Sequence, residues 1–139
     1  MLELRLLGTP GVTSHGEATA VSAIQGQSLA LLAVLACAGE RGVAREKLFT
    51  LFWPDAAAEP AAHRLSQLSH STRRALGCPD LVSGQAELKL NPVRTACDLW
   101  AFCEARRAGE LDRAAALYGG PFLDGFFLPH NAEFEHWAE

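Results

Sequence analysis

The segment between residues 60 and 79 combines hydrogen-bond donors with a complete absence of carboxylates. If this segment is helical, His63, Gln67, His70 and Arg74 share one face, because residues four, seven and eleven positions apart lie above one another. In the DNA major groove, glutamine can read adenine and arginine can read guanine. The pattern therefore favours contact with nucleic acid, although a polar outer helix face is more often simply solvated.

The cysteines form no metal-binding motif. No two of them are spaced C-x2-C, and His63 and His70 lie seven residues apart, whereas zinc sites space their histidines by roughly three to five. We therefore expect reduced thiols, no metal site and no cofactor, with Cys37 packed as a small side chain in an apolar helix. The thiols are those of Cys37, Cys78, Cys97 and Cys103.

Four histidines are candidate general bases, but none lies in a nucleophile elbow, a phosphate loop or a metal motif. A histidine on the outer face of a helix is usually solvated, and no catalytic residues are assigned. We expect a binding protein and not an enzyme. The four candidates are His63, His70, His130 and His136.

The elements that must position the 60–79 segment follow from periodicity and from the glycines and prolines that interrupt it. Alternation predicts an N-terminal strand over residues 2–6, with two more short strands in one small antiparallel sheet. An all-round apolar helix is buried, as we expect for 27–38. The other predicted elements are strands 12–14 and 19–22, helices 45–53 and 59–76, and a hairpin of 81–83 with 87–90.

The last part of the chain reads as helical. Asp98 is the expected N-cap of a helix to residue 108, and a second helix over 111–118 would complete an αα-hairpin, the unit of helical repeats. Asn131 is the expected cap of a last helix that carries Phe134 and Trp137. Because that helix reaches Glu139 with no stop signal, the pattern suggests a truncated chain.

Composition restricts the class of protein. The 139 residues are 49% hydrophobic and 20% charged, which is typical of a globular domain with a core. The longest apolar run, 29–38, is too short to span a membrane, and no signal peptide is recognisable, so we expect a soluble cytoplasmic protein. The formal charge is +1 over residues 1–96 and −5 over 97–139, which indicates two units with different partners.

A sheet, three helices and a hairpin, in that order, are typical of a winged helix. The predicted fold class is α+β: a winged helix-turn-helix over 1–96 with an N-terminal antiparallel sheet and a C-terminal β-hairpin wing, then a helical segment over 97–139. In this architecture the third helix enters the major groove of double-stranded DNA.

Several segments, taken together and in order, resemble the SARP-type bacterial transcriptional activators. This family has an OmpR/PhoB-like winged helix followed by a helical bacterial transcriptional activator domain of tetratricopeptide-like (TPR-like) repeats. The resemblance covers essentially the whole chain and implies a cytoplasmic regulator. The segments that carry it are Leu4–Gly8, Leu29–Ala36, Gly42–Leu48, Leu51–Asp55, Arg73–Gly77, Leu88–Pro92, Cys97–Phe102 and Tyr118–Phe126.

The resemblance assigns roles to particular residues. It implies that the wing residue Lys89 reaches the minor groove and that Arg45, at the start of the second helix, contacts phosphate. Partners implied are double-stranded DNA, RNA polymerase or another transcription component, and a second copy in a homodimer, with no membrane. The residues implied to read the major groove are His63, Arg64, Gln67, His70, Ser71 and Arg74.

Some positions depart from the family pattern. Thr72 and Ser69 stand where apolar residues are usual, and a buried Leu-to-Thr change costs about 1–3 kcal/mol. Ser71 replaces a frequent arginine, Ala44 replaces a capping residue, and Glu87 would lie near phosphate. We expect weakened DNA affinity.

The alternative function is a protein interaction module with weak or no DNA binding. It rests on the acidic segment 97–139 and on the apolar side chains of Phe126, Phe127 and Trp137, which we expect to be exposed. A truncated repeat would expose the same surface, because stacked repeats bury each other's faces.

Overall fold

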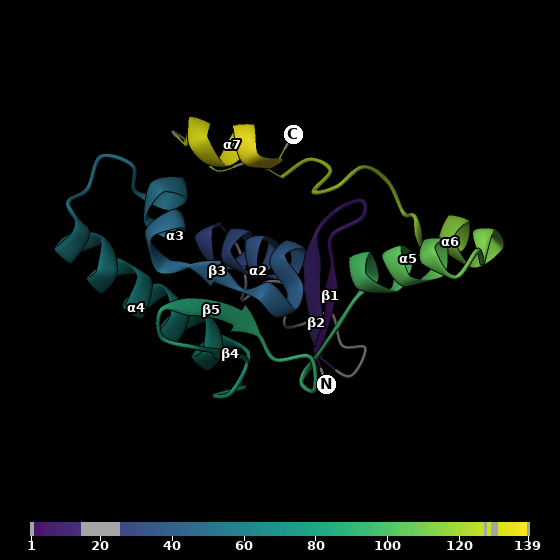
Figure 1. Ribbon diagram of the computed structural model, residues 1–139, viewed down its shortest axis with the longest axis horizontal. Coiled ribbons are helices and arrows are strands. Elements are labelled where there is room, and N and C mark those ends of the chain that lie inside the picture. Colours follow the sequence, from purple (N-terminus) through teal and green to yellow (C-terminus); the bar gives the residue numbers. More distant parts are fainter. Residues whose placement is uncertain (1, 15–25, 127, 129–130, 139) are drawn as a thin grey trace.

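Helix α2 (Gln27–Ala38) lies at the centre of the molecule, and every residue from Leu29 to Ala36 is buried, as its composition predicts. The computed structural model describes residues 2–14, 26–126, 128 and 131–138 (Figure 1). Within them, helices and two small sheets share one hydrophobic core, so the α+β class is observed.

The first sheet has β1 (Leu2–Arg5) between β2 (Gly11–Ser14) and β6 (Thr95–Cys97). Leu2 and Leu4 are buried and their neighbours are exposed, which is the predicted alternation. β2 is antiparallel to β1, as predicted, whereas β6, a strand that was not predicted, joins this sheet parallel to β1. The chain from β1 to β6 includes most of the other elements, and parallel strands need a long connection of this kind. The strand expected over 19–22 lies outside the described residues.

The second sheet has the order β3 (Val43–Ala44), β5 (Glu87–Leu90), β4 (Val82–Ser83), and all its pairings are antiparallel. The hairpin of β4 and β5 lies where the sequence predicts it. Gly84 makes its turn with φ +105°, where a side chain would collide with the carbonyl oxygen of Glu87. The two-residue strand β3 was not predicted, since it is too short to show alternation.

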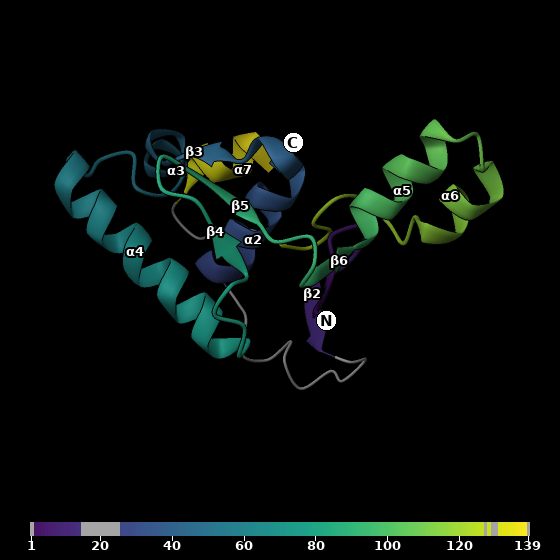
Figure 2. The ribbon, with the colours of Figure 1, turned by 60° about the horizontal axis from the view of Figure 1, so that its bottom comes forward.

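The remaining helices begin and end close to the predicted positions. α5 and α6 pack on each other as the expected helical pair, and they lie at the opposite end of the molecule from α4 (Figures 1 and 2). These helices are α3 (Arg45–Phe52), α4 (Ala58–Ala75), α5 (Asp98–Arg107), α6 (Leu111–Leu117) and α7 (Ala132–Ala138). The 3-10 turn η1 (Gly39–Arg41), which follows α2, was not predicted.

Asp98 does not cap its own helix, so that prediction is wrong. Its carboxylate accepts hydrogen bonds from the backbone N–H groups of Leu6 (2.8 Å) and Leu7 (3.0 Å), just beyond β1. β1 and β6 run side by side, which brings the first residue of α5 next to these two free donors. The side chain therefore extends the β1–β6 pairing and fixes the start of α5 to the first sheet.

The segment after α6 returns to the first unit. Phe122 forms a β-bridge with Leu7, and Asn131 caps α7 by accepting from the Phe134 N–H (3.0 Å), as predicted. The Asn131 amide also donates to the Leu51 carbonyl oxygen (2.9 Å), so α7 lies on α3. Phe134 is 1% exposed and stacks on the ring of Phe52. The core of the unit predicted for 1–96 is thus completed by Leu123, Leu128 and Phe134, which are all buried.

This return corrects the expectation of an exposed aromatic surface. Phe126 and Trp137 are partly buried against the core, and Phe127 lies outside the described residues. The Phe126 ring meets the Phe134 ring edge-on, with 6.0 Å between the ring centroids, and the Trp137 ring is tilted against Phe134 at 5.4 Å. Of the aromatic side chains that motivated the alternative function, the two that the structure describes are therefore packed within this molecule.

The cysteines also differ from expectation. Cys37 is exposed, while Cys97 is the buried thiol. Burial raises the pKa of the Cys97 thiol from 9.0 to about 12. Among the described residues, no three His, Cys, Asp or Glu side chains gather as a metal-binding group.

No helix within the described ranges is both long enough and apolar enough to cross a membrane.

Candidate nucleic-acid interface

Two helices joined by a short loop position the predicted residues. α3 stops before Trp53-Pro54, and the 18-residue α4 follows from Ala58. The end of α4 is fixed by Gly77 at φ +63°, where the Cys78 N–H reaches back to the Arg73 carbonyl oxygen (3.0 Å). These two helices have the succession of a helix-turn-helix, and α4 lies along one edge of the molecule (Figure 2).

The inward face of α4 is buried at Ala61, Leu65, Ser69 and Thr72. Burial of the last two confirms that the unusual polar residues face the core. The Thr72 hydroxyl donates to the Leu68 carbonyl oxygen at 2.7 Å, so it is not left without a partner. This bond removes the larger part of the expected cost, because an unsatisfied buried hydroxyl is the expensive case.

All six residues predicted on α4 are exposed. Arg64, Gln67 and Ser71 line a shallow hollow beside Trp53, toward the start of α2. His70 and Arg74 line another hollow, which lies near the end of α4. The predicted residues therefore form one continuous outer surface along the helix.

Arg73 is a residue that we did not assign to the interface. It is half-buried, and its Nε donates to the Ser69 carbonyl oxygen at 3.3 Å. With Arg45, Ser66 and Gly84 it lines a small hollow of about 160 Å³, where the start of α3, the side of α4 and the hairpin meet. Two guanidinium groups and a hydroxyl at one hollow suit a phosphate. In the sequence, Arg73 stood out only as one of the donors that flank the predicted face.

The hairpin is tied to the start of α3. The Arg45 N–H donates to the Ala86 carbonyl oxygen at 3.1 Å, which satisfies one free donor of a helix whose N-cap, Ala44, has no side-chain acceptor. Arg45 is thereby held at the corner where α3, α4 and the hairpin turn meet. Glu87 is exposed on the same hairpin and lies opposite Ala44.

Lys89 lies apart from the other predicted residues. Leu88 and Leu90 on either side of it are buried, so the lysine projects from the other face of β5. Ser83 pairs with it on that face. Lys89 lines a different cavity with Glu40 and none of the α4 residues.

The charges near α4 leave its arginine side chains available to bind another molecule. Asp80, just beyond α4, forms an ion pair with Arg94 (3.0 Å), and this hydrogen bond lowers the pKa of the carboxyl group. Within the described part of the chain, no carboxylate pairs with Arg64 or Arg74. Arg73 and Arg74 also lie in the last turn, where positive charge favours the helix.

Comparison with known proteins identifies the fold. The chain is similar to EmbR of Mycobacterium tuberculosis, whose structure was solved in complex with a low affinity phosphopeptide. The TM-score is 0.67 at 24% sequence identity, over 99% of this chain and 40% of the EmbR chain. The chain therefore spans 40% of EmbR's length and shares the α+β fold of that part. No protein-family profile and no curated protein matches the chain.

Proposed function

We propose that this chain is a sequence-specific DNA-binding transcriptional regulator, an activator of the SARP type, and not an enzyme. One observation carries the proposal. The second helix of a helix-turn-helix presents an uninterrupted exposed face of hydrogen-bond donors, with no carboxylate between residues 60 and 79 and no internal ion pair to its arginines among the described residues.

In this proposal α4 enters the major groove, which is about 12 Å wide and accepts a helix. Gln67 and Arg74 are the residues proposed to read base edges. Arg45 and Arg73 are proposed to bind phosphate beside them, and the β4–β5 hairpin acts as the wing, with Lys89 directed to the adjacent minor groove. His63, Arg64, His70 and Ser71 complete the proposed contact surface.

The proposal includes other partners. The chain carries a formal charge of −4 and the exposed Glu87 on its hairpin, so one copy is expected to bind weakly and to act as a homodimer on repeated half-sites. The α5–α6 pair is proposed to begin a TPR-like domain that contacts RNA polymerase or another transcription component in the cytoplasm. EmbR's phosphopeptide supports the idea of a protein partner for the related fold.

The test is the anisotropy of labelled duplex DNA, enriched from a random library with the full chain, titrated at several salt concentrations. We expect the logarithm of affinity to fall linearly with log salt at a slope of several units, since each neutralised phosphate contributes roughly one unit. Gln67→Ala should keep the salt slope and lose discrimination between the enriched duplex and a scrambled one.

Absence of salt-dependent binding, even at low salt, would contradict this proposal. It would favour the interaction module instead. One observation supports the interaction module. On the α5–α6 pair, Leu111 is 71% exposed and Tyr118 is 50% exposed, and exposed apolar side chains are typical of partner sites.

A further inference from the structure

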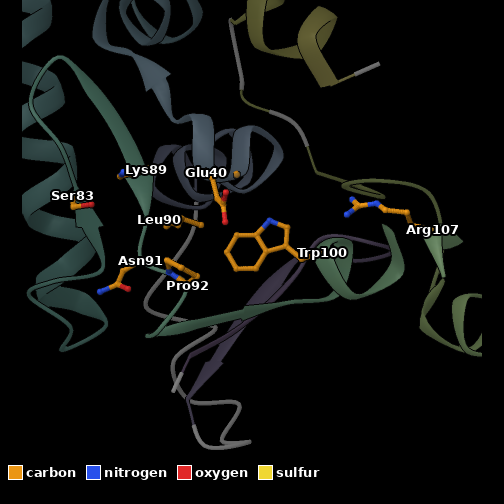
Figure 3. A pocket seen from close by; sticks show the side chains of 9 residues that line it. Glu40, Ser83, Lys89, Leu90, Asn91, Pro92, Trp100 and Arg107 are labelled. Carbon is orange, nitrogen blue, oxygen red and sulfur yellow. The ribbon is translucent and has the colours of Figure 1, made fainter. Parts of the chain in front are cut away.

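A cavity of about 810 Å³ opens between the outer face of the β4–β5 hairpin, the turn η1 and α5. Its volume falls within the range of roughly 300–1,000 Å³ that is usual for small-molecule sites. Its main lining consists of three apolar side chains, Leu90, Pro92 and Trp100, and three charged ones, Glu40, Lys89 and Arg107 (Figure 3).

The aromatic wall of this cavity is held in place. The Trp100 indole Nε1–H donates to the Ala36 carbonyl oxygen at 2.8 Å, at the end of α2, where helix carbonyls lack partners. Asp98 holds the start of the same helix against the first sheet. Leu90 is 4% exposed and belongs to the core. A ligand would therefore meet a preformed apolar surface, with little ordering cost on binding.

Two cations border that surface from different elements. Lys89 comes from the hairpin and Arg107 from the end of α5, and both are exposed. Within the described ranges neither pairs with a carboxylate. Figure 3 shows the Arg107 side chain extending toward Trp100, while the Glu40 carboxylate extends toward the indole from η1. The lining thus carries two positive charges and one negative charge around an indole.

We propose that this cavity binds a small flat aromatic acid. An aromatic ring fits against the indole, with Pro92 and Leu90 beside it, because aromatic rings pack favourably on one another. Carboxylate or phosphate groups of the ligand point to Lys89 and Arg107, which are charged at neutral pH. Glu40 can only accept, so it favours a ligand with a hydroxyl or amino group on the ring and disfavours a plain acid.

The lining of the cavity includes no residue of α4, the helix that the proposed function places in the major groove. It does use Lys89, which the proposed function assigns to the wing. Bound ligand would therefore connect the hairpin of the first unit with the first helix of the second.

The experiment is a ¹H–¹⁵N NMR titration of the full chain with 6-hydroxy-2-naphthoate. We expect saturable shifts of the Trp100 indole N–H, assigned with Trp100→Phe, and of the backbone N–H groups of Lys89 and Arg107. Two further titrations use 2-naphthoate, which lacks the hydroxyl, and inorganic phosphate, which lacks the ring. Binding should weaken for the first and be absent for the second.

Matched variants on α5 distinguish binding in this cavity from a general effect of positive charge on the affinity. Arg107→Gln removes the proposed ion pair between Arg107 and the ligand carboxylate. Because this pair is exposed to solvent, the affinity should fall only about threefold to fivefold. Arg106→Gln changes the neighbouring arginine, which lies over Phe102 and outside the cavity, and should leave the affinity unchanged. Glu40→Ala removes the acceptor and should erase the preference for the hydroxylated acid. Shifts centred on α4, equal losses from the two arginine variants, or equal binding of inorganic phosphate would overturn the proposal.

Discussion

Two arginines at one end of the molecule have partners of a kind that two arginines at the other end lack. At the α5–α6 end, Arg113 pairs with Glu110 (3.0 Å), and Arg106 lies over the Phe102 ring, 5.8 Å from its centroid. On α4, within the described part of the chain, Arg64 and Arg74 have neither kind of partner. Since exposed pairs contribute little stability, about 0–1 kcal/mol, the difference concerns the charges left available to another molecule.

The first prediction tests this difference with two double variants. Arg64→Ala with Arg74→Ala should weaken binding to the enriched duplex roughly a hundredfold, because each lost contact costs about 1–2 kcal/mol. Arg106→Ala with Arg113→Ala removes the same charge from the other end and should leave the affinity within a factor of two or so, as no DNA contact is assigned there. Anisotropy at one fixed salt concentration measures both. Equal losses would mean that α4 is not the binding face.

The second prediction concerns the junction that joins the two ends. Gly8 has φ +99°, and a Cβ there would lie 2.9 Å from the Gly119 carbonyl oxygen. Gly8→Ala should therefore lower the free energy of unfolding by about 2–3 kcal/mol, combining backbone strain with a displaced backbone. Gly77→Ala is the control, since its φ is +63° with no atom within 4 Å. Gly77→Ala should cost only about 1 kcal/mol. Urea unfolding of both variants measures the two losses. Similar losses would show that the approach to Gly119 is not tight.

The third prediction concerns Cys97, which is buried at the same junction. Its pKa is raised from 9.0 to about 12 in the folded chain, so well below pH 9 the thiol is protonated in both states and has no effect on stability. Between pH 9 and 12 the unfolded chain loses this proton first, and stability falls. At pH 10 the loss should be about 1 kcal/mol relative to pH 8.

Urea unfolding at both pH values, under reducing conditions, measures this loss. Cys97→Ala removes the thiol and should show a smaller alkaline fall than the parent chain. The same fall in both proteins would assign the effect to other groups.

Features set by local periodicity were predictable from the sequence. The all-round apolar run predicted a buried α2, and the proline and glycine signals placed α4 to within one residue at each end. The exposure of His63, Gln67, His70 and Arg74 followed from helical spacing. Their contact with DNA stays a prediction.

Features that depend on distant segments were not predictable. The parallel pairing of β6 rests on three residues, and the return of α7 rests on Asn131 reaching the Leu51 carbonyl oxygen, 80 residues away in sequence. Arg73 and Arg45 line the same hollow because the β4–β5 hairpin lies beside both of them, and the sequence does not show this arrangement. For Lys89, the resemblance implied a role in the wing, but nothing in the sequence indicated which neighbours it would meet.

The carboxylate of Asp98 has a consequence for the order of folding. β1 leaves the ribosome well before its partner β6 and this carboxylate, because Asp98 lies 92 positions after Leu6 in the sequence. At a synthesis rate of about 5–20 residues per second, one edge of β1 waits roughly 5–20 s for its partner. Contacts of such long sequence separation close late, so the edge of β1 that pairs with β6 becomes fixed later than the edge that pairs with β2.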